Sequence, residues 1–345
     1  MKQLQAIILK HLILQSPEQS IAVQFIKKYV SSKDNHAKLL GYRDRNGWSL
    51  LHIALLSQKD VIIKELFKHY SKLFEQEYPE YLELAYFCAK FNCCSSMKTL
   101  FELLKFDDKL QLGRALLCAA ESNFVEFVRL IILNKNEVGH FNGLNNRFGE
   151  SLIHIAIKIQ SPELFDLVIS LGDVDSLNAK EMKYGDTPLL SCCKLLQKGD
   201  DEDSIVNMMA MADTLLQQGS DPNLPNDKGI TPLHVAVYYA NETLIYLLLK
   251  YSAKVDTPSK EGNIPLLMAI NHASSNEDSI LLMLQQDDID IKCLEQAFKE
   301  ARSKKEQNKI ILSMLKVAIE DHVKKSKEYL IKSSIAECKP LSPRL

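Results

Sequence analysis

The stretch "GITPLHVAV", residues 229–237, decides the fold of this 345-residue chain. Gly229 permits the positive φ that a tight turn requires. Thr231 is placed to cap the start of a helix. Pro232 follows at the first helical position, where a missing N–H costs nothing. The apolar residues after it fit one helical face. The stretch therefore predicts a tight turn followed by a short buried helix.

Related stretches recur along the chain. They are "GWSLLHIAL" at Gly47, "GRALLCAAE" at Gly113, "GESLIHIAI" at Gly149, "GDTPLLSCC" at Gly185 and "GNIPLLMAI" at Gly262. Their glycines are 33 to 44 residues apart, except for a first gap of 66 that fits two units. A period near 33 that carries T-P-L-H-x-A is the signature of ankyrin repeats. The chain resembles the ankyrin-repeat family, most specifically at 229–237.

The resemblance implies an all-α fold, an ankyrin-repeat solenoid of stacked antiparallel helix pairs with helical terminal caps. We expect an N-terminal helical pair and linker at 1–43 and about seven repeats at 44–289, one or two of them degenerate. A C-terminal helical cap at 290–325 and a partly disordered tail at 326–345 would follow. The unit that begins at Gly185 carries extra length, which we interpret as an acidic loop at 195–204 between its two helices.

The first fifteen residues predict a helix. Its expected apolar face consists of Leu4, Ile7, Ile8, Leu12 and Leu14. Lys10 and His11 interrupt the apolar run and no small-residue cleavage site follows, so we expect no secretory signal. No apolar run approaches the ~20 residues of a membrane helix.

His52, His154 and His234 occupy the same position of the repeat. The resemblance implies a structural role for this histidine, with its ring bonding backbone groups between neighbouring units. Equivalent positions of packed helices lie about 8–10 Å apart, too far to share one metal ion. We therefore expect no metal site at these histidines.

The eight cysteines form no C-x-x-C pair, and most lie in apolar helical stretches. The strongest enzyme alternative is a thiol hydrolase that uses Cys118 with His154, which would require a Cys–His contact of ~3 Å and a lowered thiol pKa. We expect no catalytic residue and no cofactor. The acidic run at 200–203 lacks the ligand spacing of a calcium-binding loop and is interpreted as solvated.

The expected partner is a protein. A net charge of −2 argues against nucleic acid. From Lys299 to Leu345 the chain carries twelve Lys or Arg and six Asp or Glu, so a weak peripheral contact with an anionic surface stays open. In the family, partners contact the turn tips beside the glycine and the residues after the motif. The candidate partner-binding residues are Trp48, Phe148, Lys183, Tyr184, Asp186, Asp227, Lys228, Ile230, Tyr238 and Tyr239.

The function expected from the resemblance is a protein–protein interaction scaffold that binds through its concave face and turn tips. The degenerate units, the richness in Lys, Asn and Ile, and the polar C-terminal tail are typical of a secreted bacterial effector that acts on a host protein. The alternative is an intracellular eukaryotic adaptor. The expected location is the cytoplasm, or the host cytosol for a secreted effector.

Overall fold

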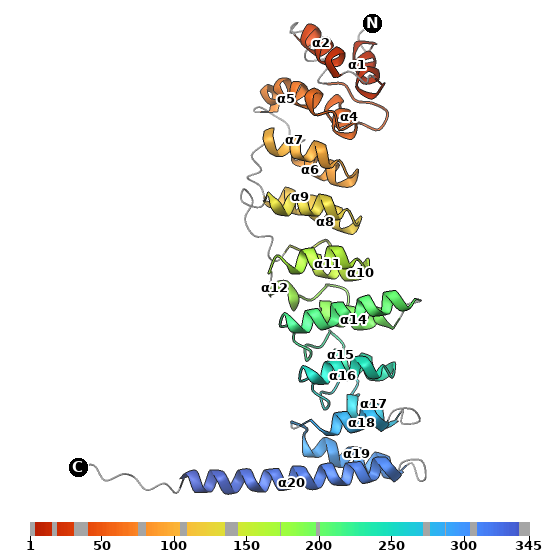
Figure 1. Ribbon diagram of the computed structural model, residues 1–345, viewed down its shortest axis with the longest axis vertical. Helices are drawn as coiled ribbons and strands as arrows, with labels where there is room; N and C mark the ends of the chain where they lie inside the picture. The colour runs from red at the N-terminus through yellow and green to blue at the C-terminus, as the bar shows by residue number, and fades with distance from the viewer. Residues whose placement is uncertain are drawn as a thin grey trace, which may run out of the picture. The chain divides into compact units, whose positions relative to one another are not determined.

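The computed structural model describes residues 4–15, 19–30, 41–74, 81–103, 109–134, 144–172, 174–197, 201–271, 277–286, 288–303 and 309–337 (Figure 1). These residues form helices joined by turns, with one isolated bridge between Asn145 and Ser151 and no strand among them. The predicted all-α fold is confirmed. Along the described part of the chain, no helix has the length and apolar character needed to cross a membrane.

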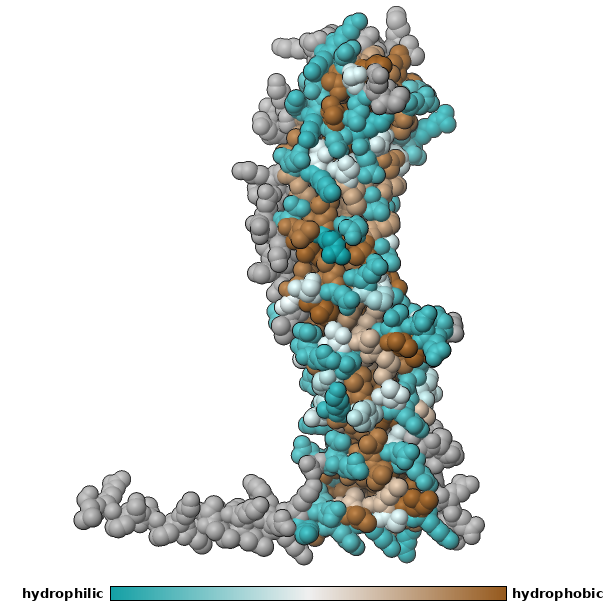
Figure 2. Space-filling model, in the orientation of Figure 1, coloured by the Kyte–Doolittle hydropathy of each residue, from teal (hydrophilic) through white to brown (hydrophobic). Residues whose placement is uncertain are grey.

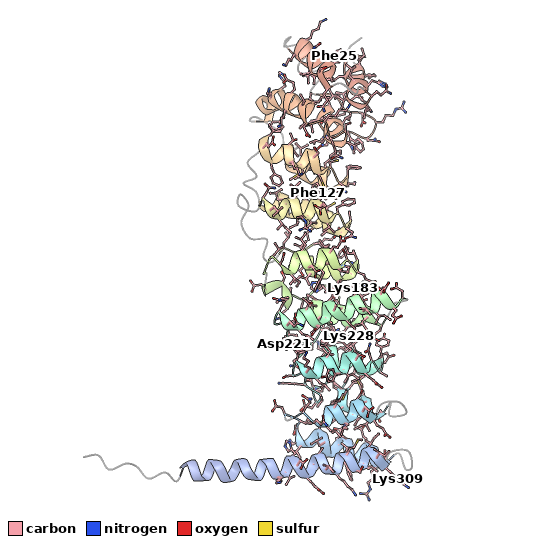
Figure 3. All side chains as sticks on the ribbon, in the orientation of Figure 1. Phe25, Phe127, Lys183, Asp221, Lys228 and Lys309 are labelled. Atoms are coloured by element: carbon pink, nitrogen blue, oxygen red, sulfur yellow. The ribbon has the colours of Figure 1, made fainter. Side chains whose placement is uncertain are left out.

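The chain divides into two compact units, residues 1–176 (unit 1) and 177–345 (unit 2). The helices of unit 1 are α1 (Leu4–Gln15), α2 (Gln19–Val30), α4 (Leu50–Leu56), α5 (Asp60–Phe74), α6 (Tyr81–Lys90), α7 (Cys94–Leu103), α8 (Lys109–Glu121), α9 (Val125–Leu133), α10 (Leu152–Lys158) and α11 (Pro162–Ile169). They stack in two rows, with α1, α4, α6, α8 and α10 in the first and α2, α5, α7, α9 and α11 in the second. Phe127, labelled in Figure 3, and Phe165 are the largest fully buried side chains in this unit.

Unit 2 repeats the same arrangement. Its helices are α13 (Pro188–Leu196), α14 (Glu202–Gln217), α15 (Pro232–Tyr238), α16 (Glu242–Lys250), α17 (Pro265–Asn271), α18 (Glu277–Leu284), α19 (Ile291–Ser303) and α20 (Lys309–Glu337). The first helix of each pair contacts the first helix of the next pair, from α13 through α15 and α17 to α19. The four-residue helix α12 (Val174–Leu177) spans the division between the units.

The stretch that predicted the fold behaves as expected. Thr231 caps α15 by accepting a hydrogen bond from the backbone N–H of His234, and Pro232 is the first helical residue. Gly229 has φ +76°, and a Cβ built on it would lie 2.7 Å from the backbone nitrogen of Lys260. Only glycine fits both this φ and this close approach.

Main-chain hydrogen bonds join the turns of successive repeats in unit 2. The N–H of Asp227 donates to the carbonyl of Tyr184 (2.9 Å), and the N–H of Lys260 donates to the carbonyl of Lys228 (3.0 Å). Side chains join the loops after the second helices. Asn178 accepts from the N–H of Asp221 (2.9 Å), a residue labelled in Figure 3. These bonds fix the spacing of the turns within the unit.

Gly113 does not lie in a turn, contrary to the sequence interpretation. It belongs to α8, where a Cβ would lie 2.7 Å from Cδ1 of Leu144. The glycine therefore leaves room against the helix for the side chain of Leu144, which comes from the loop before α10. The sequence resembled the motif at this position because apolar residues follow the glycine in both settings.

The extra length after Gly185 lies in a helix rather than in a loop. Helix α14 has 16 residues, against 9 in α16, and it begins at Glu202. Asp201 caps it by accepting from the N–H of Ser204, and Glu202 and Asp203 lie in its first turn. Acidic residues are favourable there because they face the positive end of the helix dipole. Residues 198–200 lie outside the described residues.

Two expectations at the chain ends need correction. In α1 the buried residues are Ala6, Leu9 and Ile13, whereas Ile7, Ile8 and Leu14, assigned to the apolar face from the sequence, are exposed. The prediction was wrong because α2 and α4 pack against the face that carries the first three.

Helix α20 crosses the boundary expected at residue 325, since it continues to Glu337. The last eight residues of the expected tail, 338–345, lie outside the described residues.

Candidate protein-binding surface

The repeated histidine is the third residue of its helix and closes a capping box. Ser49 with His52, Ser151 with His154 and Thr231 with His234 form the three boxes. In each, Nδ1 of the ring accepts from the backbone N–H of the capping residue, at 3.1 Å for Thr231. Nδ1 is thus an acceptor, which leaves the ring proton on Nε2.

His234 also links two repeats, as the resemblance implied. Its Nε2–H donates to the carbonyl of Asn263 in the following turn, at 3.0 Å. Burial lowers the pKa of His234 below the ordinary value for histidine, and the hydrogen bond to Asn263 opposes this shift. The neutral ring therefore serves as a structural bridge between the turn before α15 and the turn before α17.

Thiol catalysis at Cys118 is not supported by its surroundings. The side chain is half-buried in α8, and burial raises the pKa of its thiol. A nucleophilic cysteine needs the opposite shift. His154 holds its Nδ1 in the capping box with Ser151 (2.9 Å to Oγ), so that nitrogen is not available as a base.

Side chains beside the turn glycine form a repeated pattern. After Gly149, Glu150 pairs with Lys158 at 2.7 Å, and after Gly185, Asp186 pairs with Lys194 at 2.6 Å. The acid is the first residue after the glycine and the lysine is the ninth. The residue before each glycine is aromatic, and the ammonium of each lysine lies over that ring: Lys158 is 5.8 Å from the centre of Phe148, and Lys194 is 5.6 Å from that of Tyr184.

The repeat at Gly229 replaces the charged pair by an apolar one. Its corresponding residues are Ile230 and Tyr238, and the residue before the glycine is Lys228. Tyr238 is 63% exposed and Tyr239 is 49% exposed. Their rings meet edge to face, with centres 4.9 Å apart. Two exposed tyrosines side by side are typical of a binding surface rather than of a solvated helix end.

These side chains line a hollow of about 390 Å³. The sequence identified Lys228, Ile230, Tyr238 and Tyr239 in it. The structure adds His234 and Val235 from α15, Lys194, Ser259, Glu261, Asn263 and Met268. The repeat numbering could have supplied Glu261 and Asn263, which flank Gly262 as Lys228 and Ile230 flank Gly229. We call this hollow and its lining residues the tyrosine hollow.

Three further candidates lie on the surface of unit 2. Lys183 and Asp227 are exposed, and Tyr184 is 45% exposed. The Lys183 ammonium lies 4.7 Å from the centre of the Tyr184 ring. Figure 3 labels Lys183 and Lys228, which come from the successive turns before α13 and α15. Tyr184 does not line the tyrosine hollow, although its neighbour Lys194 does.

Asp186 is not a surface contact, contrary to the sequence interpretation. It is 5% exposed, and its carboxylate accepts from Lys194 and from Nδ2 of Asn226 (2.8 Å). The buried pair fixes the position of Lys194 beside the turn.

The ring of Trp48 packs against other aromatic rings of unit 1. Trp48 is half-buried, and the centre of its ring lies 5.5 Å from that of Phe87 and 5.4 Å from that of Phe91. The ring packs against α6, the next first-row helix. Phe148, by contrast, is 47% exposed.

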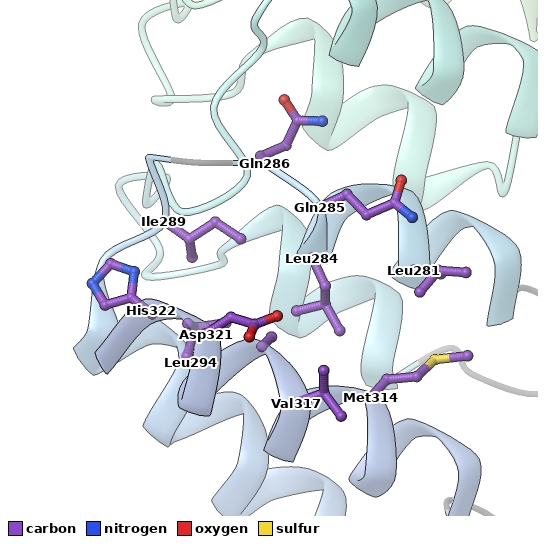
Figure 4. A pocket seen from close by; sticks show the side chains of 11 residues that line it. Leu281, Leu284, Gln285, Gln286, Ile289, Leu294, Met314, Val317, Asp321 and His322 are labelled. Atoms are coloured by element: carbon purple, nitrogen blue, oxygen red, sulfur yellow. The ribbon is translucent and has the colours of Figure 1, made fainter. Parts of the chain in front are cut away.

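A different hollow lies between α18, α19 and α20 in unit 2 (Figure 4). It measures about 370 Å³, and its wall includes Leu284, Leu294 and Val317. Asp321 and His322 lie at one end and Met314 at the other (Figure 4). In the space-filling view, apolar surface emerges between polar side chains in each unit (Figure 2).

Comparison with known proteins supports the repeat assignment. Residues 204–294 match the family model described as ankyrin repeats, three copies. Human Rabankyrin-5 is 30% identical over 39% of this chain and 11% of its own length. A fowlpox virus chain named as an ankyrin repeat protein is 28% identical over 51% of this chain and 48% of its own. The B-cell lymphoma 3 protein homolog of mouse is 26% identical over 41% and 29%.

The aligned regions thus span half or less of the length of these relatives. The family match covers most of α14 and all of α15 to α18, and it includes the capping box at His234 and every lining residue of the tyrosine hollow except Lys194. Paired helices, turn glycines at positive φ and the capping box at His234 agree with the family match there: residues 204–294 of this chain contain ankyrin repeats.

Proposed function

We propose that this protein is a scaffold that binds a partner protein at the tyrosine hollow of unit 2. The observation that carries the proposal is the exposed pair Tyr238 and Tyr239 beside a hollow of about 390 Å³. Tyrosine supplies a large apolar area and a hydroxyl while losing little conformational entropy on binding. An apolar side chain of the partner would enter the hollow against Ile230 and Val235.

Charged residues form a rim around this hollow. Lys228 and Glu261 are exposed at its edge, and Lys194 is held by Asp186. Rim charges act mainly on the association rate and on orientation, whereas the buried anchor determines the lifetime of a complex. The proposal therefore assigns affinity to the tyrosines and Ile230, and assigns steering to Lys183, Asp227 and Lys228.

The test uses a phage-displayed peptide library selected on the full chain. Selected peptides should bind the unaltered protein, and replacing Tyr184, Ile230 and Tyr238 together by alanine should weaken them at least tenfold with little change in melting temperature. Tyr246→Ala is the matched control, because Tyr246 lies in α16 of the same unit and is 58% exposed. Equal binding to the folded triple variant would contradict the proposal.

A finer proposal concerns the setting, in which the scaffold is a secreted bacterial effector that acts on a host protein. It is supported by the degenerate repeats, the Lys-, Asn- and Ile-rich composition and the polar C-terminal residues. The alternative is an adaptor within a eukaryotic cell. A reporter fused to the chain and active only after entry into host cytosol distinguishes the two. Signal from infected host cells supports the effector, and its absence despite secretion-competent bacteria contradicts it.

A further inference from the structure

A groove in unit 1 carries charge that the proposed function does not use. Its volume is about 680 Å³, and it is lined by residues of α6, α8 and α10 and of the turn before α10. Arg114 comes from α8 and Arg147 from the turn, and both are exposed. We call it the arginine groove.

Each arginine is held by an aromatic ring. The guanidinium carbon of Arg114 lies 5.6 Å from the centre of the Tyr86 ring, and that of Arg147 lies 4.7 Å from that of Phe148. Among the described residues, neither guanidinium is within 4.0 Å of a carboxylate oxygen. Cation–π stacking orients a guanidinium while leaving its N–H donors able to bind another group.

The other charged side chains that line the groove have partners within it. Lys158 and Glu150 neutralise one another at 2.7 Å. Glu121 accepts from Nδ2 of Asn146 at 2.9 Å, which fixes its carboxylate without cancelling its charge. The groove therefore presents two oriented cations and one anion. That balance favours a ligand with a few separated carboxylates, which can pair with the arginines away from Glu121, over a continuous phosphate backbone, some of whose charges would lie against Glu121.

We propose that the arginine groove binds an acidic segment of a protein partner, with carboxylates paired to Arg114 and Arg147. A guanidinium matches a carboxylate with two parallel N–H donors, and such charge-assisted pairs are the strongest protein hydrogen bonds. Half-buried Tyr86 and exposed Phe148 supply apolar contact beside the carboxylates. This site lies in unit 1, so it does not depend on the tyrosine hollow.

The test measures fluorescence anisotropy of a labelled peptide that alternates Glu with Ser, against a peptide with Gln in place of Glu. The full chain should bind the Glu peptide and not the Gln peptide at low salt, and should bind it more weakly near 0.15 M salt. The double variant Arg114→Gln with Arg147→Gln should lose at least tenfold in affinity. The single tryptophan, Trp48, reports through its emission that unit 1 stays folded.

The matched control removes two exposed positive charges of unit 1 outside the groove, by Lys98→Gln with Arg129→Gln. Near 0.15 M salt it should bind the Glu peptide within about twofold of the unaltered protein, since charges outside the groove are largely screened at that ionic strength. Equal losses in both double variants would overturn the proposal in favour of general attraction.

Absence of binding by the unaltered protein would also overturn it, as would tighter binding of a single-stranded oligonucleotide that displaces the peptide. Retained binding of the Glu peptide in the variant with Tyr184, Ile230 and Tyr238 replaced by alanine separates this proposal from the first.

Discussion

The repeats at Gly185 and Gly229 have the same turn but present different side chains. Both glycines have positive φ, +70° and +76°, and both are followed by a threonine cap and a proline. Beside the first turn a buried carboxylate pairs with Lys194, and beside the second Ile230 and Tyr238 line a hollow. The comparison teaches that two sets of residues have separate tasks. The turn glycine, the capping threonine and the histidine of the capping box determine the repeat backbone, and we call them the backbone set. The first and the ninth residue after the glycine, such as Ile230 and Tyr238, determine what the surface can bind, and we call them the surface set.

The largest effect should come from the backbone set. Gly229→Ala forces a Cβ into a positive-φ position and against the backbone of Lys260. We expect it to lower the free energy of unfolding by about 3 kcal/mol. Gly262→Ala is the control, because its φ is +80° but its Cβ would have no neighbour within 4 Å. It should cost about 1 kcal/mol. Urea unfolding followed by circular dichroism measures both, and equal losses would mean that the contact with the next turn is unimportant.

His234→Ala should come next, with a loss of about 1–3 kcal/mol from buried hydrogen bonds. The backbone N–H of Thr231 and the carbonyl of Asn263 would each lose the imidazole as a hydrogen-bond partner. Thermal unfolding of the variant and the unaltered chain measures the loss. A stable variant that had lost a specific activity would contradict the structural role.

The pH dependence of the same site gives a second readout. The pKa of His234 in the folded chain is below the ordinary histidine value of about 6.5, so just below pH 6.5 the unfolded chain binds a proton there and the folded chain does not. This contribution to stability is complete above pH 6.5 and decreases as the pH falls to the folded pKa, by at most about 1.4 kcal/mol per pH unit. The difference in unfolding free energy between the unaltered chain and His234→Ala should therefore shrink between pH 7.5 and the folded pKa. A constant difference would mean that the ring is not buried as a neutral group.

Exchanging the surface set tests the comparison directly. Ile230→Asp with Tyr238→Lys gives the repeat at Gly229 the charged pair found at Asp186 and Lys194. We expect a folded protein that binds peptides selected on the tyrosine hollow at least tenfold more weakly, about 1.4 kcal/mol. Anisotropy titration measures the affinity. Unfolding of the variant would show that these positions also hold the backbone, and the proposed separation would be wrong.

The smallest effect should come from a charged pair on the surface. Lys158→Met removes the partner of Glu150, which keeps its hydrogen bond to Asn146. An exposed ion pair contributes about 0–1 kcal/mol, so the melting temperature should change little. A loss above about 2 kcal/mol, measured by urea unfolding, would instead assign these pairs to the backbone set.

The sequence was most informative about the backbone set. Gly229, Thr231 and His234 each fulfil a local requirement of φ, capping or hydrogen bonding, and such requirements are visible in a single stretch. Gly113 shows the limit of local prediction, because the side chain that lies against it belongs to Leu144, 31 residues away. A local pattern cannot report which distant residue will approach it.

The candidate surface was only partly predictable. Tyr238 and Tyr239 were identified because the repeat does not require aromatics there. Asp186 was misassigned because its partners, Lys194 and Asn226, lie eight and forty residues further on. Arg114 was missed as a groove residue because it lies within a helix and not beside a turn glycine. Burial and pairing of a side chain depend on the neighbouring repeat, which no single repeat encodes.

The main-chain bonds between turns have an evolutionary consequence. Tyr184 and Lys228 contact the following turns through their carbonyl groups, which every residue type possesses. Their side chains can therefore mutate without loosening the junctions between repeats. A lineage could change the ligand of this scaffold through substitutions at these two positions while keeping the main-chain bonds between its turns.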